Sequence, residues 1–100
     1  MEYFIAKEAS QDLDEILDYF LVCNINAGER FLQQFNKKCQ NIAQFPNIGR
    51  SYVKFDPSLR GISLDSYIIF YQVFEDSVVI VRVVSGYRDL KSIFADVDDE

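Results

Sequence analysis

The stretch that decides the fold reads YIIFYQVF at residues 67–74, EDS at 75–77 and VVIVRVV at 78–84. Its two apolar runs are rich in β-branched and aromatic residues, which is typical of strands, and the polar insert between them predicts a tight turn. Residues 59–64 (LRGISL) form a weaker strand pattern, and the turn signal Asp65-Ser66 separates them from residue 67. The three runs predict an antiparallel meander.

Two amphipathic helices are predicted ahead of this meander. Apolar residues recur three or four positions apart over residues 9–21, and we expect Ser10 to be the N-cap. A second stripe of the same period covers residues 27–43, with Asn26 as the expected cap and Pro46 just beyond the end. Two helices joined by a short break, each with one apolar stripe, predict a helical hairpin.

A strand candidate at residues 3–6 (YFIA) precedes the helices, and residues 89–94 could form one or two helical turns after the last strand. The predicted order is β-α-α-β-β-β. The fold class is therefore α+β, with a helical hairpin packed on one face of a small antiparallel sheet. At 100 residues, we expect a single domain over residues 1–100. The place of the first strand in the sheet stays open at this point.

Both faces of the predicted sheet are largely apolar. Strict alternation places residues 67, 69, 71 and 73 on one face and 68, 70, 72 and 74 on the other, and the next strand repeats this with 79, 81 and 83 against 78, 80, 82 and 84. One hairpin can cover only one face. The other is covered either by the C-terminal segment folding back or by a partner chain. The partner chain is our preferred expectation, because large exposed apolar patches usually mark interaction sites.

Charge and composition narrow the function. The net charge is −6, and residues 30–91 carry nine Lys or Arg and five acids, whereas residues 1–29 carry one Lys and seven acids. This overall acidity argues against strong nucleic-acid binding. With no span for a membrane and no leader pattern, we expect a cytoplasmic protein. Cys23 and Cys39 should lie about 18 Å apart along the hairpin, and we expect both to be free, buried thiols.

The chain contains no histidine, which excludes Ser-His-Asp and Cys-His catalysis. It has no phosphate loop, dinucleotide fingerprint or clustered metal ligands, so no cofactor and no metal are expected. The remaining candidates are cations and a tyrosine near the sheet: Lys54, Arg60, Arg82, Tyr87, Arg88 and Lys91. Such groups can bind phosphates or stabilise developing charge. Their alternative role is pairing with neighbours such as Asp65 and Asp89.

Five short patterns occur in a fixed order along the chain: Ala9, Asp12-Leu13, Ile16 and Tyr19-Phe20; FPNIGR at 45–50; Leu59-Arg60; YIIFY at 67–71; and VRVVSGYRD at 81–89. Each is weak alone, and their combination resembles the ParE/RelE toxin superfamily over essentially the whole chain. The resemblance implies the toxin component of a type II toxin–antitoxin system. RelE-like members cut messenger RNA on the ribosome, and ParE-like members are known as inhibitors of DNA gyrase.

Departures from the family pattern favour the ParE-like branch. Ile68 stands where many relatives carry arginine, Phe94 stands where the RelE branch places its tyrosine, and no Lys-x-Lys pair occurs near Leu59. Arg88 alone matches a catalytic arginine of that branch. We therefore expect a gyrase inhibitor and no catalytic residues. The alternatives are a RelE-like endonuclease, in which Arg88 would be catalytic, and an inactive homologue that only binds its antitoxin.

The resemblance also implies a partner. The C-terminal segment of a cognate antitoxin is expected to wrap the helices and sheet in a hetero-oligomer, with the basic region 30–91 attracting acidic residues. DNA gyrase is the expected target, with no direct contact to nucleic acid or membrane. The candidate target- or antitoxin-binding residues are Arg60, Arg82, Tyr87, Arg88, Phe70 and Phe74.

Overall fold

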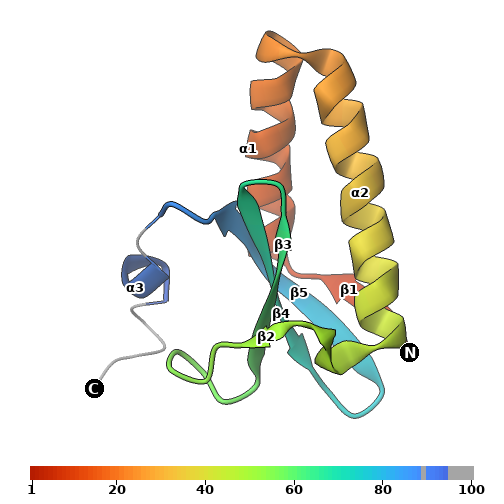
Figure 1. Ribbon diagram of the computed structural model, residues 1–100, viewed down its shortest axis with the longest axis vertical. Coiled ribbons are helices and arrows are strands. Elements are labelled where there is room, and N and C mark those ends of the chain that lie inside the picture. Colours follow the sequence, from red (N-terminus) through yellow and green to blue (C-terminus); the bar gives the residue numbers. More distant parts are fainter. Residues whose placement is uncertain (89, 95–100) are drawn as a thin grey trace.

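The computed structural model describes residues 1–88 and 90–94. Its elements are β1 (Glu2–Ile5), α1 (Lys7–Cys23), α2 (Ile25–Gln44), the 3-10 helix η1 (Pro46–Ile48), β2 (Arg50–Ser51), β3 (Leu59–Leu64), β4 (Tyr67–Val73), β5 (Ser77–Ser85) and α3 (Leu90–Ile93). Figure 1 shows α1 and α2 as a hairpin standing against the sheet, with a tip that projects beyond it. The predicted α+β class and element order are confirmed, and β2 is an additional short strand.

Five strands form one mixed sheet in the order β1-β5-β4-β3-β2. The pairs within the meander are antiparallel as predicted, but β1 runs parallel to β5, with Tyr3 opposite Val78. The prediction of a wholly antiparallel sheet is therefore wrong at this edge. The reason is the path of the chain: β1 and α1 run one way, α2 returns, and three alternating strands bring β5 back to the direction of β1 (Figure 1).

The first core lies between the hairpin and the sheet. Its buried residues are Ala9, Leu13, Ile16, Phe31, Phe35, Cys39, Ile42, Leu64, Ile69, Tyr71, Val78, Ile80 and Val83. The two helices approach closely near their junction, as Gly28 shows: a Cβ atom at this position would lie only 2.9 Å from Cβ of Phe20. These are the helical stripes and the sheet face that the periodicity predicts.

The helix starts differ from the predicted ones. α1 begins at Lys7 with Ala6 at the N-cap and no side-chain cap, so Ser10 lies inside the first turns of the helix. At α2 the cap is Asn24 instead of Asn26, and its Oδ1 accepts a hydrogen bond from the Ala27 N–H at 3.1 Å. The break between the helices is therefore the single residue Asn24. The absence of a side chain at Gly28 allows the two helices to pack closely next to this break.

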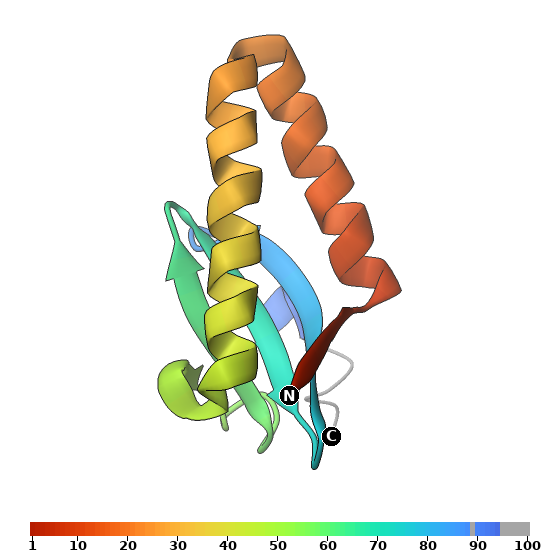
Figure 2. The ribbon, with the colours of Figure 1, turned by 90° about the vertical axis from the view of Figure 1, so that its right-hand side faces the viewer.

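The second face of the sheet is covered by the chain itself. A second apolar cluster contains the buried residues Leu59, Phe70, Val84 and Phe94. The Phe94 ring, just after α3, lies 5.0 Å from the Phe70 ring and 5.4 Å from that of Phe55 between centroids. Figure 2 shows α3 behind the sheet, on the side opposite α2. Our preferred expectation of a partner chain over this part of the face is wrong, and the fold-back of the C-terminal segment is confirmed.

A β-bulge in β5 changes which side chains share a face. Tyr71 pairs with Ile80 and Phe70 with Arg82, so Val81 is an extra residue between the two pairs. Strict alternation predicts that Val83 points away from Ile80, but both belong to the first core, whereas Val81 packs on the second. One extra residue shifts the phase of a strand by one position, which reverses the faces beyond it.

The two cysteines have different surroundings. Cys39 is buried and Cys23 is exposed near the hairpin tip, and both are free. The prediction of buried thiols is thus right for Cys39 and wrong for Cys23. Burial raises the pKa of the Cys39 thiol to about 12. Within residues 1–88 and 90–94, no helix has the length and apolar character to cross a membrane.

Candidate functional site

Arg82, a predicted binding residue, is held by an ion pair with Asp12 of α1. Its Nε and Nη2 atoms donate to the two Asp12 carboxylate oxygens at 2.8 and 3.0 Å. The Val83 N–H donates to the same carboxylate at 2.9 Å, at the edge of β5 beyond its pairing with β1. The hydrogen bond from Arg82 to Asp12 is also the main cause that raises the pKa of Arg82. Arg82 therefore joins α1 to the sheet edge, and its charge is neutralised.

Arg60 and Tyr71 hold the loop that contains the FPNIGR motif. The Tyr71 hydroxyl donates to the Pro46 carbonyl at 2.7 Å and accepts from the Gly49 N–H at 2.9 Å. The Arg60 Nη1 atom donates to the Gly49 carbonyl at 2.7 Å and to the Asn47 carbonyl at 3.4 Å. Arg60 thus binds backbone carbonyls and not the predicted neighbour, Asp65. The hydrogen bonds keep the loop in one conformation.

The glycine of the FPNIGR motif, Gly49, lies where there is no room for a side chain. A Cβ atom at this position would lie 2.7 Å from Cε1 and 2.9 Å from Cζ of the Tyr71 ring. The Tyr71 side chain is fully buried, so its ring has little freedom to move aside. The motif is therefore built around the close approach of the loop backbone to the core.

Phe70 and Phe94 are both inside the second core. Phe70 has no exposed surface and Phe94 is 7% exposed. Phe70 therefore cannot contact a partner without opening this core. Phe94, which stands where RelE-like toxins carry a tyrosine, is a packing residue with no group that transfers a proton.

The other predicted residues, Phe74, Tyr87 and Arg88, are exposed. Tyr87 is 91% exposed in the turn after β5, and Phe74 is 51% exposed at the opposite end of that strand. Arg88 lines a groove of about 280 Å³ together with Glu15 and Tyr19 of α1. The predicted neighbour of Arg88, Asp89, lies outside the described residues. The structure therefore does not gather the six candidates into one site.

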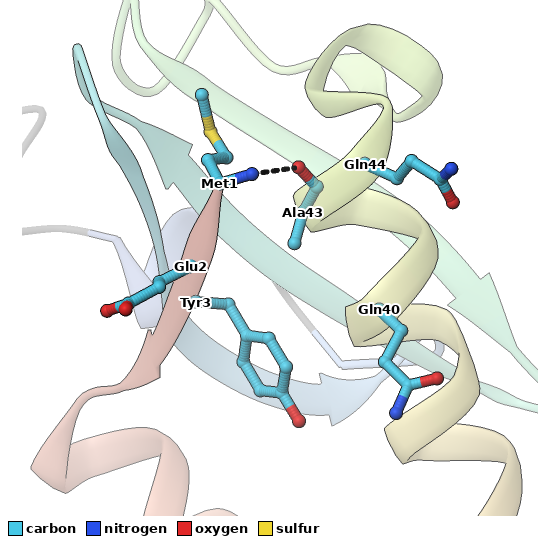
Figure 3. A pocket seen from close by; sticks show the side chains of 6 residues that line it. All are labelled: Met1, Glu2, Tyr3, Gln40, Ala43 and Gln44. Carbon is cyan, nitrogen blue, oxygen red and sulfur yellow. Dashed lines mark hydrogen bonds between the residues drawn. The ribbon is translucent and has the colours of Figure 1, made fainter.

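A hollow of about 470 Å³ lies between β1 and the last turns of α2. In Figure 3 the Tyr3 ring points into the space between the two elements, and Glu2 points away from it. The amino group of Met1 donates to the Ala43 carbonyl at 3.5 Å across one end. The lining carries one carboxylate and no nucleophile paired with a base, so it lacks the groups for hydrolytic chemistry.

Three of the exposed apolar side chains of the hairpin, those of Leu21, Ile25 and Leu32, line another hollow near its tip. We call it the hairpin groove; it measures about 360 Å³ and is lined by Leu17, Phe20, Leu21, Ile25, Gly28, Glu29 and Leu32. Leu21 and Ile25 are 62% and 57% exposed. The hairpin tip projects beyond the sheet (Figures 1 and 2), while Leu17 and Phe20 at the base of the groove pack against the first core. An apolar groove between two helices is a common binding site for an amphipathic helix of another protein.

The chain matches known proteins along most of its length. Residues 3–90 match the family described as "ParE toxin of type II toxin-antitoxin system, parDE". The chain belongs to this ParE toxin family. Toxin ParE1 of Mycobacterium tuberculosis, in two strains, is 28% identical over an alignment of 90 residues that covers 88% of this chain and 92% of the relative. A solved structure titled "Chromosomal ParDE TA system from P. aeruginosa" has a TM-score of 0.72 at 20% identity, over 85% of this chain and 95% of that one.

Two residues outside the predicted candidates line the hairpin groove. Periodicity places Leu21 on the core stripe of the first helix, and Ile25 lies between the two predicted stripes, yet both line the groove. The available signal was the spacing of Leu17, Leu21 and Ile25, which repeats every four residues and drifts away from the stripe of Leu13 and Ile16. In this ParE-family chain, a second apolar stripe beside the core stripe marked the exposed groove.

Proposed function

We propose that this ParE-family toxin inhibits DNA gyrase and is neutralised by a cognate antitoxin that binds the hairpin groove. The observation that carries the choice against a nuclease is the engagement of Arg60 and Arg82 within the fold. Arg60 is bound to loop carbonyls and Arg82 to Asp12, so neither is free for a phosphodiester. Phe94 supplies no acid or base, and the chain has no histidine.

The hairpin groove is the best-supported place for the antitoxin. Its apolar lining fits the apolar stripe of an amphipathic helix, and the exposed parts of Leu21 and Ile25 would lose contact with water on binding. Its rim is acidic. Glu29 lines the groove, and the exposed Asp14 and Asp18 each lie three residues before a lining residue, Leu17 and Leu21, and so on the neighbouring turn of α1. The complementary antitoxin segment therefore carries apolar residues flanked by Lys or Arg, in place of the acidic residues expected from the basic region 30–91.

Producing the chain alone in bacteria tests the target. Inhibition of gyrase predicts loss of negative supercoiling or accumulation of cleaved DNA while messenger RNA stays intact. Codon-linked RNA cleavage that Arg88→Ala abolishes would instead support the RelE-like alternative. Normal growth together with antitoxin binding would support the inactive homologue.

The groove is tested with Leu21→Lys and the matched variant Val22→Lys. Val22 is 88% exposed and does not line the groove, so the two changes add the same charge one residue apart. Leu21→Lys is expected to weaken antitoxin binding at least tenfold and to leave toxicity unchanged. Equal antitoxin affinity for both variants would remove the groove from the proposal.

A further inference from the structure

The loop after the C-terminal end of α2 is hydrogen-bonded to the fold on its core side and exposes apolar side chains on its outer side. We name its outward side chains Phe45, Ile48 and Arg50 the η1 surface. Phe45 and Ile48 are 57% and 47% exposed. The Ile48 N–H donates to the Phe45 carbonyl at 3.1 Å, and residues three apart in such a turn lie one above the other. In Figure 2 this turn projects from the foot of α2, on the side away from β1.

The conformation of this surface is fixed before any partner binds. Tyr71 and Arg60 donate to the carbonyls of Pro46, Gly49 and Asn47, and the Tyr71 hydroxyl accepts from the Gly49 N–H. A partner therefore meets a loop whose backbone is already held in place, which lowers the entropy lost on binding. A loop that served only to connect α2 with β2 would gain nothing from presenting two large apolar side chains to water.

The surface lies in a stretch of purely positive charge. Residues 30–55 contain five Lys or Arg and no Asp or Glu, a net charge of +5 in a chain of net charge −6. None of the five makes an ion pair with a carboxylate in residues 1–88 and 90–94; Arg50 lies 5.5 Å from the Tyr52 ring. Lys37 is exposed on the α2 turns above Phe45, about 12 Å away along the axis.

From these observations we infer that the η1 surface is a second protein-binding surface, whose occupant presents apolar residues surrounded by Asp and Glu. Apolar side chains near Arg50, which makes no ion pair with a carboxylate of the described residues, fit such a partner, and the charge speeds its association. Duplex DNA fits less well, because its backbone offers no apolar counterpart to Phe45 and Ile48 and the chain as a whole is acidic. About 24 Å of helix separates Gly28 in the hairpin groove from Gln44. The two surfaces can thus be occupied by different proteins.

This inference rests on the proposed function in one respect: it assigns the hairpin groove to the antitoxin and the η1 surface to the target. Purified DNA gyrase and the antitoxin are the two probes. The variants are Ile48→Ser and Arg50→Glu, with Val22→Ser as the apolar control and Lys7→Glu as the charge control. All four positions are exposed, and thermal unfolding followed by circular dichroism verifies that each variant is folded.

We expect Ile48→Ser and Arg50→Glu each to raise the toxin concentration needed for half inhibition of gyrase at least tenfold, with antitoxin affinity within twofold of wild type. The controls should match wild type in both assays. Raising the salt concentration should weaken inhibition by wild type more than inhibition by Arg50→Glu.

Three results would overturn the inference: unchanged potency of both variants, loss of antitoxin affinity in place of potency, or binding of duplex DNA that Arg50→Glu abolishes. If wild type arrests growth without affecting gyrase, the gyrase proposal fails. The same variants then test the η1 surface through growth arrest, where unchanged arrest overturns it. A wild-type chain that neither inhibits gyrase nor arrests growth overturns both proposals.

Discussion

Replacing Tyr71 by phenylalanine should destabilise the protein through the loss of one hydroxyl group. This hydroxyl accepts from the Gly49 N–H at 2.9 Å and donates to the Pro46 carbonyl at 2.7 Å. The ring keeps its place in the first core, since phenylalanine has the same shape without the oxygen. The change therefore isolates the connection between the core and the loop before β2.

The size of the effect follows from the burial of each partner. Gly49 is buried, and leaving its N–H without an acceptor costs about 1–3 kcal/mol. Pro46 is half-buried, so water can replace part of that bond, and its loss costs about 0.5–1 kcal/mol. We expect a fall of about 2–3 kcal/mol in the free energy of unfolding. For a domain of this size, such a fall lowers the melting temperature by roughly 8 °C or more.

Urea unfolding of wild type and Tyr71→Phe measures this difference, and amide hydrogen exchange locates it. The Gly49 amide should exchange much faster in the variant, while amides of β4 and β5 should change only as much as global stability does. Tyr67→Phe, at a half-buried position of the same strand, is the control. A Tyr71→Phe variant within about 0.5 kcal/mol of wild type, or a Gly49 amide with unchanged relative protection, would refute the reasoning.

Three further predictions concern other parts of the molecule. Asp12→Ala should lower the free energy of unfolding by about 2–4 kcal/mol, because it leaves the Arg82 guanidinium and the Val83 N–H unpaired. A double-mutant cycle with Arg82→Ala should give a coupling energy above about 1 kcal/mol. Additive effects of the two changes would contradict the ion pair. With a thiol reagent at pH 8, Cys23 should react at once and Cys39 only after unfolding, since burial holds the pKa of Cys39 near 12; two fast thiols would contradict this. Burial also raises the pKa of Tyr71; the unfolded chain therefore loses this proton first, and stability should fall as the pH rises above about 10, more steeply in wild type than in Tyr71→Phe.

The sequence was sufficient for the elements whose periodicity is set by one dominant core. The stripe of Phe31, Phe35 and Cys39 and the alternation of residues 67–73 predicted the hairpin, the meander and the face on which they meet. The parallel β1 edge could not be read in the same way, because four residues of strand pattern carry no information on their neighbour in the sheet.

Two local features escaped prediction for physical reasons. The bulge at Val81 has no signature in the sequence, because every residue of 78–84 except Arg82 is Val or Ile and either phase of the alternation buries apolar side chains. The covering of Phe70 by Phe94 depends on a turn after β5 that redirects the chain, and apolar character alone did not distinguish this from cover by a partner. The prediction of Phe70 as a contact residue is wrong for this reason, since its side chain is fully buried.

The exposed surfaces were the least predictable part. Leu21 and Ile25 look like core residues in a helical pattern, and their exposure follows from how far the hairpin projects beyond the sheet. Arg60 and Arg82 look like binding cations in the sequence, but in the fold they are bound to the Gly49 carbonyl and the Asp12 carboxylate.

The most direct measurement is supercoiling by purified DNA gyrase with increasing amounts of the purified chain, in the presence and absence of its antitoxin. The account predicts dose-dependent inhibition that a stoichiometric amount of antitoxin reverses. Full gyrase activity at a large excess of folded chain would contradict it.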